Sequence, residues 1–335
     1  MKFLIVGLGS MGKRRVRCLQ ALKAEKVVGF DPREDRRSEA KEKYGIETFA
    51  KIEDAFASGV DALVISTPPD LHMTYAKMAV EHDKHFFCEA SVTDDGMVDV
   101  MAMLKGKKIV AAPSCTMRFH PAVKIIKKLV DEKAIGKLEA FSAHCGQWLP
   151  DWHPWEDYRT YYVSKRATGA CREIVPFELT WLVWVLGSFQ QVAGMRGKVS
   201  ELDADIDDIY QLLLRSEAGL YGHLMVDVLA RYATRSLRLI GSEGTIDWVA
   251  DTKEVRLFTV QSGKWESFKE EASRVEQGYS YLSAEGIYVE EMQAYADACA
   301  GKKPFPMTME DDHRVLKTLY ASEKSSDTGI YQKLG

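Results

Sequence analysis

Residues 1–31 read MKFLIVGLGSMGKRRVRCLQALKAEKVVGFD, and this stretch decides the fold. A short apolar run leads into a Gly-x-Gly-x-x-Gly turn at 7–12, a basic segment compatible with a helix follows, and a second apolar run ends on Asp31. The order of strand, glycine turn, helix, strand and acid is typical of a dinucleotide-binding βαβ unit. The stretch therefore predicts a Rossmann domain at the start of the chain.

Each glycine of the turn has its own expected role. Gly7 permits the tight turn, Gly9 lets the pyrophosphate approach the backbone, and Gly12 lets the helix pack closely on the strand. The backbone N–H groups that follow, from Ser10 and Met11, then face the phosphates at the start of the helix. We expect these five residues to bind the cofactor.

Asp31 lies nineteen residues after Gly12, close to the spacing at which an acid binds the adenosine ribose hydroxyls. Its charge repels a 2′-phosphate and favours NAD. Three arginines follow at Arg33, Arg36 and Arg37, and any of them could hold that phosphate if Asp31 turned away. We expect NAD, with NADP as the alternative. A methyltransferase that binds S-adenosylmethionine also uses a glycine-rich turn and a ribose-binding acid, but the place of Gly12 in the helix start favours the dinucleotide.

Composition limits the class of protein. A chain of 335 residues predicts two domains. The net charge of −4 gives no electrostatic case for binding nucleic acid or an anionic membrane. No apolar run approaches the roughly 20 residues of a membrane helix. The six cysteines show no metal-binding spacing, so we expect reduced thiols in a cytoplasmic protein and no metal site.

The pattern of expected strands and helices changes near residue 120. Up to that point, strands and helices alternate, which predicts a doubly wound parallel sheet over 1–120 with its ligand at the carboxyl ends of the strands. Residues 121–335 predict an α+β domain with a large, open, mainly antiparallel sheet, whose last helices are free to pack back on the first domain. A broad sheet face of this kind also suits a subunit interface, so we expect a homodimer or homotetramer.

Several further segments resemble one family of oxidoreductases. These segments are the Thr67-Pro68-Pro69-x-x-His72 turn, the strand ending in Glu89, the run Arg118-Phe119-His120-Pro121, and Gly301-Lys302-x-Pro304 before a last helix. Together with the βαβ unit they resemble the Gfo/Idh/MocA family, named for glucose–fructose oxidoreductase and inositol dehydrogenase. The resemblance implies a Rossmann domain and a C-terminal sheet domain that oxidise or reduce a sugar, cyclitol or sugar acid with NAD(H) or NADP(H). It places Thr67, Pro68, His72 and Glu89 at the cofactor and Arg118 at the substrate.

The chain departs from the family pattern at two places. The family has Glu-Lys-Pro after the fourth strand, with the lysine beside the nicotinamide, whereas this chain has Glu89-Ala90-Ser91. In the C-terminal domain, Glu173 stands where the family has an Asp, and Phe177 stands where it has a His often assigned as acid or base. Two proton-handling groups are therefore expected to be replaced.

Oxidation of an alcohol still needs a base for the hydroxyl proton. Glu173 is the first candidate for this base, and the alternative is that it only forms a salt bridge or caps a helix. Lys165 could supply the positive charge of the missing family lysine, and the alternative is that it is a solvated surface lysine. Arg172 has the geometry to clamp a carboxylate or phosphate, against an ion pair with Glu173 or Glu178.

Residues 148–159, WLPDWHPWEDYR, combine aromatic rings, charges and two prolines. Sugars present C–H faces to aromatic rings and hydroxyls to charged groups, so this segment is a candidate lid, with Trp152 and Tyr158 at the substrate. His153 is the best histidine for acid–base work because its ordinary pKa is near neutral. The alternative is a loop packed against the domain or a partner subunit.

Three functions remain open from the sequence. The first is an NAD(P)-dependent oxidoreductase acting on a sugar, cyclitol or sugar-acid derivative by hydride transfer. The second is an NAD-assisted lyase or glycosidase of the same fold, which restores its cofactor in each cycle. The third is a non-catalytic dinucleotide-binding protein that senses or assembles.

Overall fold

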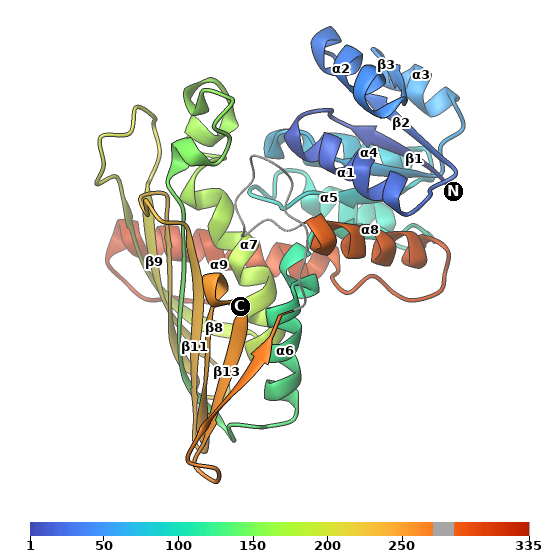
Figure 1. The fold of residues 1–335 in the computed structure, drawn as a ribbon. Helices are drawn as coiled ribbons and strands as arrows, with labels where there is room; N and C mark the ends of the chain where they lie inside the picture. Colours follow the sequence, from blue (N-terminus) through green and yellow to red (C-terminus); the bar gives the residue numbers. More distant parts are fainter. Residues whose placement is uncertain (271–284, 335) are drawn as a thin grey trace. The chain divides into compact units, whose positions relative to one another are not determined.

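The computed structural model describes residues 1–270 and 285–334 (Figure 1). Contacts divide the chain into two compact units. The first contains Met1–Thr116 together with Glu285–Arg314, and the second contains the described residues from Met117 to Glu270 and from Val315 to Leu334. The first unit is therefore discontinuous in sequence, because a C-terminal segment completes it.

The first unit is built on a six-stranded parallel sheet in the order β3-β2-β1-β4-β5-β6. Its inner strands are almost wholly apolar and buried, as expected when helices cover both faces. The register pairs Val6 with both Phe30 and Ile65, and Ile65 with Cys88, so these strands end on one rung. The strands are β1 (Lys2–Val6), β2 (Lys26–Phe30), β3 (Glu47–Phe49), β4 (Ala62–Ile65), β5 (His85–Cys88) and β6 (Ala111–Pro113).

Helices connect these strands, and a helix from the C-terminal part of the chain joins them. The helices are α1 (Ser10–Ala21), α2 (Glu34–Tyr44), α3 (Ile52–Ala57), α4 (His72–Glu81), α5 (Met97–Leu104) and α8 (Glu285–Cys299). In α8, the buried Tyr295 donates a hydrogen bond to the Leu63 carbonyl over 3.0 Å and packs its ring on Phe3 and Phe87. Helix α8 is thus part of the core of this unit. Helix α9 (Met309–Thr328) begins in the first unit and ends in the second.

The second unit contains a nine-stranded sheet in the order β14-β13-β12-β11-β7-β10-β9-β8-β15. Its pairs are antiparallel except for β7 and β10. The strands are β7 (Leu138–Gly146), β8 (Phe189–Gly197), β9 (Ile209–Ser216), β10 (Tyr221–Asp227), β11 (Thr234–Gly241), β12 (Gly244–Val249), β13 (Glu254–Thr259), β14 (Trp265–Lys269) and β15 (Gln332–Lys333). The expected mixed architecture, a Rossmann sheet followed by an open and mainly antiparallel sheet, is confirmed.

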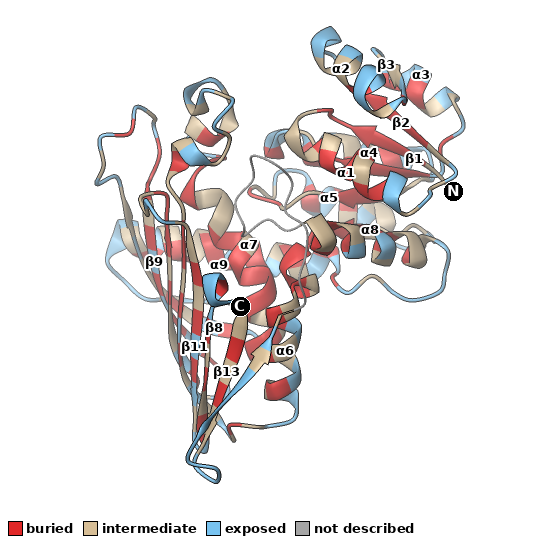
Figure 2. Cartoon of the chain, in the orientation of Figure 1, coloured by how far each residue is buried: buried red, intermediate tan, exposed pale blue. Residues whose placement is uncertain are grey.

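Helices α6 (Pro121–Asp131) and α7 (Cys171–Leu186) lie along one face of this second sheet (Figure 1). Buried and exposed residues alternate along the strands, most regularly in β9, because one face packs on helices (Figure 2). The other face carries large apolar side chains that are exposed in the single chain: Met195, Leu213, Tyr221 and Ile240.

Two elements of the structure were not assigned from the sequence. The second half of the aromatic stretch from Trp148 to Gly187 is a 16-residue helix, α7, with Pro176 inside it. The residue before that helix, Ala170, is buried and has a φ of +52°, a conformation that favours glycine. Strand β3 is the other such element, and it forms one edge of the six-stranded sheet.

Candidate cofactor and substrate sites

The glycine turn between β1 and α1 is shaped by close backbone contacts. Gly7 has a φ of +92°, and a Cβ at Gly12 would lie 1.9 Å from the Gly7 carbonyl oxygen, so neither position tolerates a side chain. Gly9 differs, because a Cβ there would meet only the Arg36 guanidinium, at 3.5 Å. Gly9 holds the N-cap position of α1 and has no side chain to occupy the N–H groups of the first turn, from Ser10 and Met11 onward. A helix start of this kind suits a phosphate.

Asp31 follows β2 directly and is held against the glycine turn. One carboxylate oxygen accepts the Leu8 N–H at 2.8 Å, and the other accepts the Arg33 N–H at 2.9 Å. The Arg36 guanidinium lies 3.6 Å from the same carboxylate, and Asp31 is only 2% exposed. Asp31, the acid expected to bind the ribose, therefore lies beside the glycine turn with an arginine next to it.

The residues after β4 form the next part of the rim. His72, the first residue of α4, is buried, and its Nε2 lies 3.0 Å from the Thr67 carbonyl oxygen. Burial lowers the pKa of His72, so the ring is neutral near pH 7 and donates to that carbonyl. Pro68 precedes a short 3₁₀ helix at Pro69–Leu71, which leads into α4. His72 thus fixes the shape of the turn that carries Thr67 and Pro68.

Glu89, after β5, is bound by an arginine from α1. Arg15 is fully buried and donates to both Glu89 carboxylate oxygens, at 2.7 and 2.8 Å. Its Nη1 lies 2.9 Å from Glu291 of α8, which is fully buried as well. Glu291 also accepts hydrogen bonds from the residues after β6: the Ser114 hydroxyl, the Cys115 N–H and the Thr116 hydroxyl. This network joins the ends of β5 and β6 to α1 and α8.

The roles of Arg15 and Glu291 were not predicted from the sequence. A signal was present, since the arginines at 14 and 15 occupy helix positions next to the sheet, where the βαβ pattern calls for apolar residues. The partner in α8 lies far away in sequence, so its identity follows only from the fold.

In the second unit, two of the proposed catalytic residues are linked through tyrosines. The Tyr162 hydroxyl donates a hydrogen bond to Glu173 over 2.9 Å. The Tyr161 ring stacks on His153 with centroids 5.6 Å apart and meets Tyr162 edge-on at 5.9 Å. Burial raises the pKa of Tyr161, and the nearby carboxylates of Glu156 and Glu173 raise it further. The lid segment and the start of α7 therefore form one polar and aromatic cluster.

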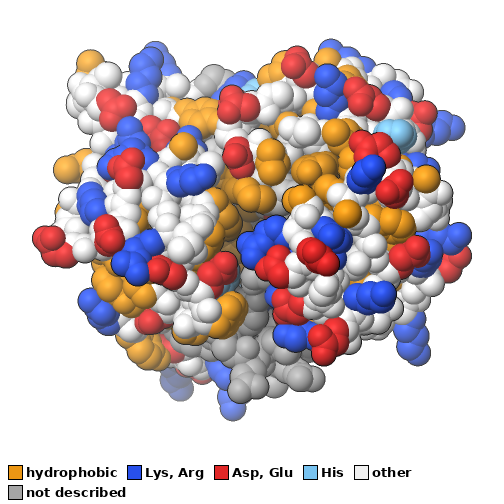
Figure 3. Space-filling view, turned by 90° about the horizontal axis from the view of Figure 1, so that it is seen from above, with side chains coloured by type: hydrophobic (Ala, Val, Ile, Leu, Met, Phe, Trp, Pro, Cys, Tyr) orange, Lys and Arg blue, Asp and Glu red, His pale blue; other side chains and the backbone are white. Residues whose placement is uncertain are grey.

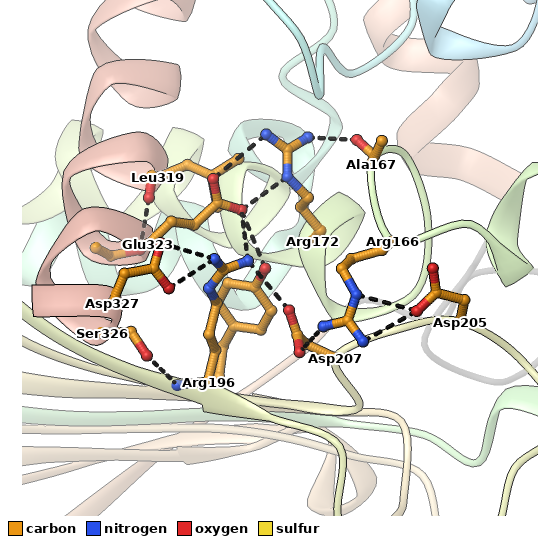
Figure 4. A network of polar contacts seen from close by, with 12 residues as sticks. Arg166, Ala167, Arg172, Arg196, Asp205, Asp207, Leu319, Glu323, Ser326 and Asp327 are labelled. Atoms are coloured by element: carbon orange, nitrogen blue, oxygen red, sulfur yellow. Dashed lines mark hydrogen bonds and ion pairs between the residues drawn. The ribbon is translucent and has the colours of Figure 1, made fainter.

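Arg172 and Lys165 are placed differently. Arg172 donates to Glu323 of α9 over 2.7 Å and to the Ala167 carbonyl over 2.5 Å (Figure 4). Its guanidinium also lies 5.6 Å from the Tyr320 ring. The guanidinium that was expected to clamp the substrate is therefore bound to protein groups. This arrangement matches the alternative of an ion pair, although the acid is Glu323 and not Glu173 or Glu178. Lys165 is exposed, and its carbonyl accepts the Gly169 N–H in the turn before α7.

The remaining expected substrate residues also have partners within the second unit. Arg118 is 8% exposed and donates to the Thr180 carbonyl of α7 at 3.1 and 3.2 Å. The Trp152 indole donates to the Gln147 carbonyl over 3.2 Å, and the Tyr158 hydroxyl accepts the Asp203 N–H over 3.2 Å. These contacts hold the lid to its surroundings.

Phe177, which the resemblance aligns with a family histidine, lies beside a buried ion pair. The Arg235 guanidinium is 5.8 Å from the Phe177 ring and pairs with Glu178 at 2.8 Å. Glu178 also accepts the Trp181 indole N–H at 2.8 Å. A buried positive charge therefore lies next to the Phe177 ring.

No group of three or more His, Cys, Asp or Glu side chains among the described residues is arranged to hold a metal ion. No helix in residues 1–270 and 285–334 is long and apolar enough to cross a membrane. On the face drawn in Figure 3, acidic and basic side chains are interspersed rather than gathered by sign.

Two family models match this chain. Residues 1–110 match "Oxidoreductase family, NAD-binding Rossmann fold", and residues 123–247 match "GFO/IDH/MocA C-terminal domain". A myo-inositol 2-dehydrogenase of Thermotoga maritima is 25% identical over 97% of this chain and 96% of its own length. A levoglucosan dehydrogenase of Pseudarthrobacter phenanthrenivorans is 29% identical, but the alignment spans 51% of this chain and 45% of that enzyme.

Solved structures share the whole fold. Levoglucosan dehydrogenase in complex with NADH superimposes with a TM-score of 0.86 at 19% identity, covering 100% of this chain and 99% of that one. A probable dehydrogenase from Thermotoga maritima gives 0.81 at 21% identity, with coverage of 100% and 99%. With both of its domains matched, the chain belongs to the Gfo/Idh/MocA family of oxidoreductases and begins with an NAD-binding Rossmann domain.

Proposed function

We propose that the protein is a dehydrogenase that oxidises a secondary hydroxyl of a cyclitol or sugar-like ring, with Glu173 as the base. The observation that carries this proposal is the hydrogen bond from Tyr162 to Glu173 in a chain whose first domain binds NAD. The names of the relatives, an inositol dehydrogenase and a levoglucosan dehydrogenase, support a cyclic polyol as the substrate.

The geometry of the first unit supports the proposed cofactor residues. Gly7, Gly9 and Gly12 form the turn for the pyrophosphate, and Asp31 faces the adenosine ribose. The neighbouring strand ends add Thr67, Pro68, His72 and Glu89, of which His72 and Glu89 act by fixing the backbone and side chains around them. The bound cofactor supplies the hydride acceptor.

The second unit supplies the proton chemistry. The Glu173 carboxylate takes the proton of the substrate hydroxyl. The cofactor, held by the residues named above, would accept the hydride from the same carbon, so that a ketone would result. Tyr162 orients the carboxylate by donating to one of its oxygens, and this bond stabilises the charged form that acts as the base. His153 and Tyr161 enclose the same cluster and provide ring surfaces for the C–H face of a polyol.

Turnover with a substrate panel tests the proposal. The purified protein is given NAD⁺ or NADP⁺ with inositols, anhydrosugars, aldoses and sugar acids, and the absorbance of the reduced nicotinamide is followed. The expected result is stoichiometric formation of reduced cofactor and a keto product with at least one cyclic polyol. Cleavage of a substrate without net reduced cofactor would instead establish the lyase or glycosidase, and binding of cofactor with no turnover of any polyol would support a sensor.

A further inference from the structure

We propose that Tyr161 is a second catalytic residue, whose hydroxyl donates a hydrogen bond to the substrate oxygen while Glu173 takes the proton of that oxygen. The inference rests on the proposed function, because it takes Glu173 as the base. It adds to that function a donor that stabilises the charge left on the oxygen. The feature that carries it is a buried hydroxyl in the cluster around Glu173.

The Tyr161 hydroxyl is buried and has no hydrogen-bond partner among residues 1–270 and 285–334. A hydroxyl in this position has given up its contact with solvent and has gained no protein acceptor in exchange, which lowers the stability of the fold. Most buried polar groups in folded proteins are paired. An exception inside a candidate site is explained when the group serves a ligand.

The neighbouring tyrosine provides the contrast. The Tyr162 hydroxyl donates to Glu173 over 2.9 Å, and the Tyr161 ring meets the Tyr162 ring edge-on at 5.9 Å. Burial raises the pKa of Tyr161, and the negative charges of Glu156 and Glu173 raise it further. Tyr161 therefore keeps its proton near neutral pH, so it is a hydrogen-bond donor and not a second base.

The other charged donors of the cluster are directed at protein groups. Arg172 and Arg235 each pair with a carboxylate of the second unit. The Nδ1 of His153 lies 3.7 Å from a carboxylate oxygen of Glu156. In the part of this cluster that the structure describes, Tyr161 is thus the buried donor that a substrate oxygen can engage without breaking an ion pair.

A stack of rings leads from the surface to Tyr161. The Trp155 side chain is 55% exposed and stacks on His153 with centroids 5.2 Å apart, and His153 stacks on Tyr161 at 5.6 Å. Trp155 and His153 belong to the lid segment, residues 148–159, and Tyr161 follows it. In this proposal a polyol enters as the lid rings separate, and its C–H face replaces a ring of the stack.

The chemistry needs both groups. The O–H bond of the substrate breaks and its proton passes to the Glu173 carboxylate, while the C–H electron pair leaves as hydride for the bound NAD⁺ and the C=O bond forms. Negative charge develops on the oxygen when the proton leaves ahead of the hydride. A donor fixed in advance stabilises that charge without reorganising, and Tyr161 keeps its own proton throughout.

The test combines stability with turnover in the full-length protein. Tyr161→Phe removes only the hydroxyl. Because that hydroxyl has no protein acceptor, the thermal unfolding midpoint is expected to equal or exceed that of the wild type. With NAD⁺ and the polyols of the panel, myo-inositol and levoglucosan first, kcat is expected to fall by about 10²- to 10³-fold while KM stays within about threefold.

Tyr162→Phe is the matched control for stability, since its hydroxyl has an acceptor, and its midpoint is expected to fall. Tyr331→Phe, at an exposed position, is the control for turnover and should change neither quantity. A fall of the Tyr161→Phe midpoint as large as that of Tyr162→Phe would mean that the hydroxyl has a structural role, and it would overturn the proposal whatever the rate.

The remaining outcomes separate this inference from the proposed function. If Tyr161→Phe keeps kcat within about threefold while Glu173→Gln loses it, Tyr161 is not catalytic and the proposed function stands. If the wild type turns over no polyol of the panel, the proposed function is wrong, and the role of Tyr161 is wrong with it.

Discussion

The Tyr162 hydroxyl and the Glu173 carboxylate lie 2.9 Å apart, and the hydroxyl donates. Glu173 belongs to the first turn of α7, and Tyr162 to the segment between the lid and α7, so one hydrogen bond ties the proposed base to the segment that follows the lid. Replacing Glu173 by Gln keeps the shape of the side chain and removes the base. We expect kcat to fall by roughly 10²- to 10⁴-fold, measured by formation of reduced nicotinamide on the identified substrate.

Two tyrosine variants separate this role from general damage. Tyr162→Phe removes the hydrogen bond but leaves the carboxylate, so it should lower kcat less than Glu173→Gln does. Tyr331→Phe, at an exposed position near the end of the chain, should change neither kcat nor KM. Full turnover of the Glu173→Gln variant, with its circular dichroism unchanged, would refute the assignment.

Alanine at Gly9 and at Gly12 should have different effects on stability. A Cβ at Gly12 lies 1.9 Å from the Gly7 carbonyl oxygen, so the backbone must move and both stability and NAD binding should fall. A Cβ at Gly9 meets the Arg36 side chain at an ordinary 3.5 Å. Gly9→Ala should therefore keep the unfolding midpoint of the wild type yet lose NAD affinity. Thermal unfolding and cofactor titration of the two variants, side by side, measure both effects, and equal loss of stability would contradict the argument.

Glu291 should be among the most sensitive positions in the first unit. Glu291→Ala leaves Arg15 buried with Glu89 as its remaining carboxylate and deprives the residues after β6 of their acceptor. Breaking a buried ion pair by removing one partner costs roughly 3–5 kcal/mol, so the denaturant midpoint of the first unit should drop sharply. Lys43→Ala, which removes an exposed i,i+4 pair with Glu39, should leave the midpoint unchanged. Comparable midpoints for the two variants would mean that the network stabilises little.

Asp312 predicts a pH dependence of stability. Burial raises the pKa of Asp312 from 3.8 to about 6. The folded protein therefore holds a proton on this group that the unfolded chain releases, and this contribution to stability is lost as the pH rises from about 4 to about 6. Asp312→Asn cannot ionise, so it should gain stability relative to the wild type across that window, by up to about 3 kcal/mol. Unfolding midpoints of both proteins, taken from about pH 4 to about pH 8, measure the difference. A difference that does not vary with pH would contradict the ionisation of Asp312.

The open face of the second sheet predicts self-association. We propose that the exposed Met195, Leu213, Tyr221 and Ile240 side chains are covered by a second copy of the chain. Leu213 is 51% exposed in the middle of β9, and Leu213→Asp should shift the mass measured by light scattering from a dimer or tetramer to a monomer. Val260→Asp, at an exposed position in the turn after β13, is the control and should keep the oligomer. A wild-type protein that is monomeric at all concentrations would refute the proposal.

Local patterns predicted the first unit well. The Gly7–Gly12 turn and Asp31 could be predicted because each requires a particular residue at a fixed spacing along the chain. The change of sequence pattern after residue 120 likewise predicted the open and mainly antiparallel second sheet. The family and its NAD cofactor, inferred from motif order, are confirmed.

Long-range contacts and the aromatic segment were beyond local patterns. Helix α7 escaped prediction because its sequence is apolar on most sides and contains Pro176, so no helical stripe is visible. The partner of Arg172 is Glu323, which is 151 residues away, and the neighbouring Glu173 and Glu178 were the natural guesses. The sequence also did not predict which of Arg33, Arg36 and Arg37 lies beside Gly9, because the position of each guanidinium is a property of the folded turn.

The discontinuity of the first unit has a consequence for synthesis of the protein. Residues 1–116 emerge from the ribosome first, but α8 is made only after the chain between Thr116 and Glu285. At about 5–20 residues per second, that interval lasts on the order of ten to thirty seconds. During this time Arg15 lacks Glu291, and Phe3 and Phe87 lack Tyr295. Until the last fifty or so residues are made, residues 1–116 of the nascent chain therefore keep part of their core uncovered. During this interval a chaperone has the most exposed apolar surface to bind.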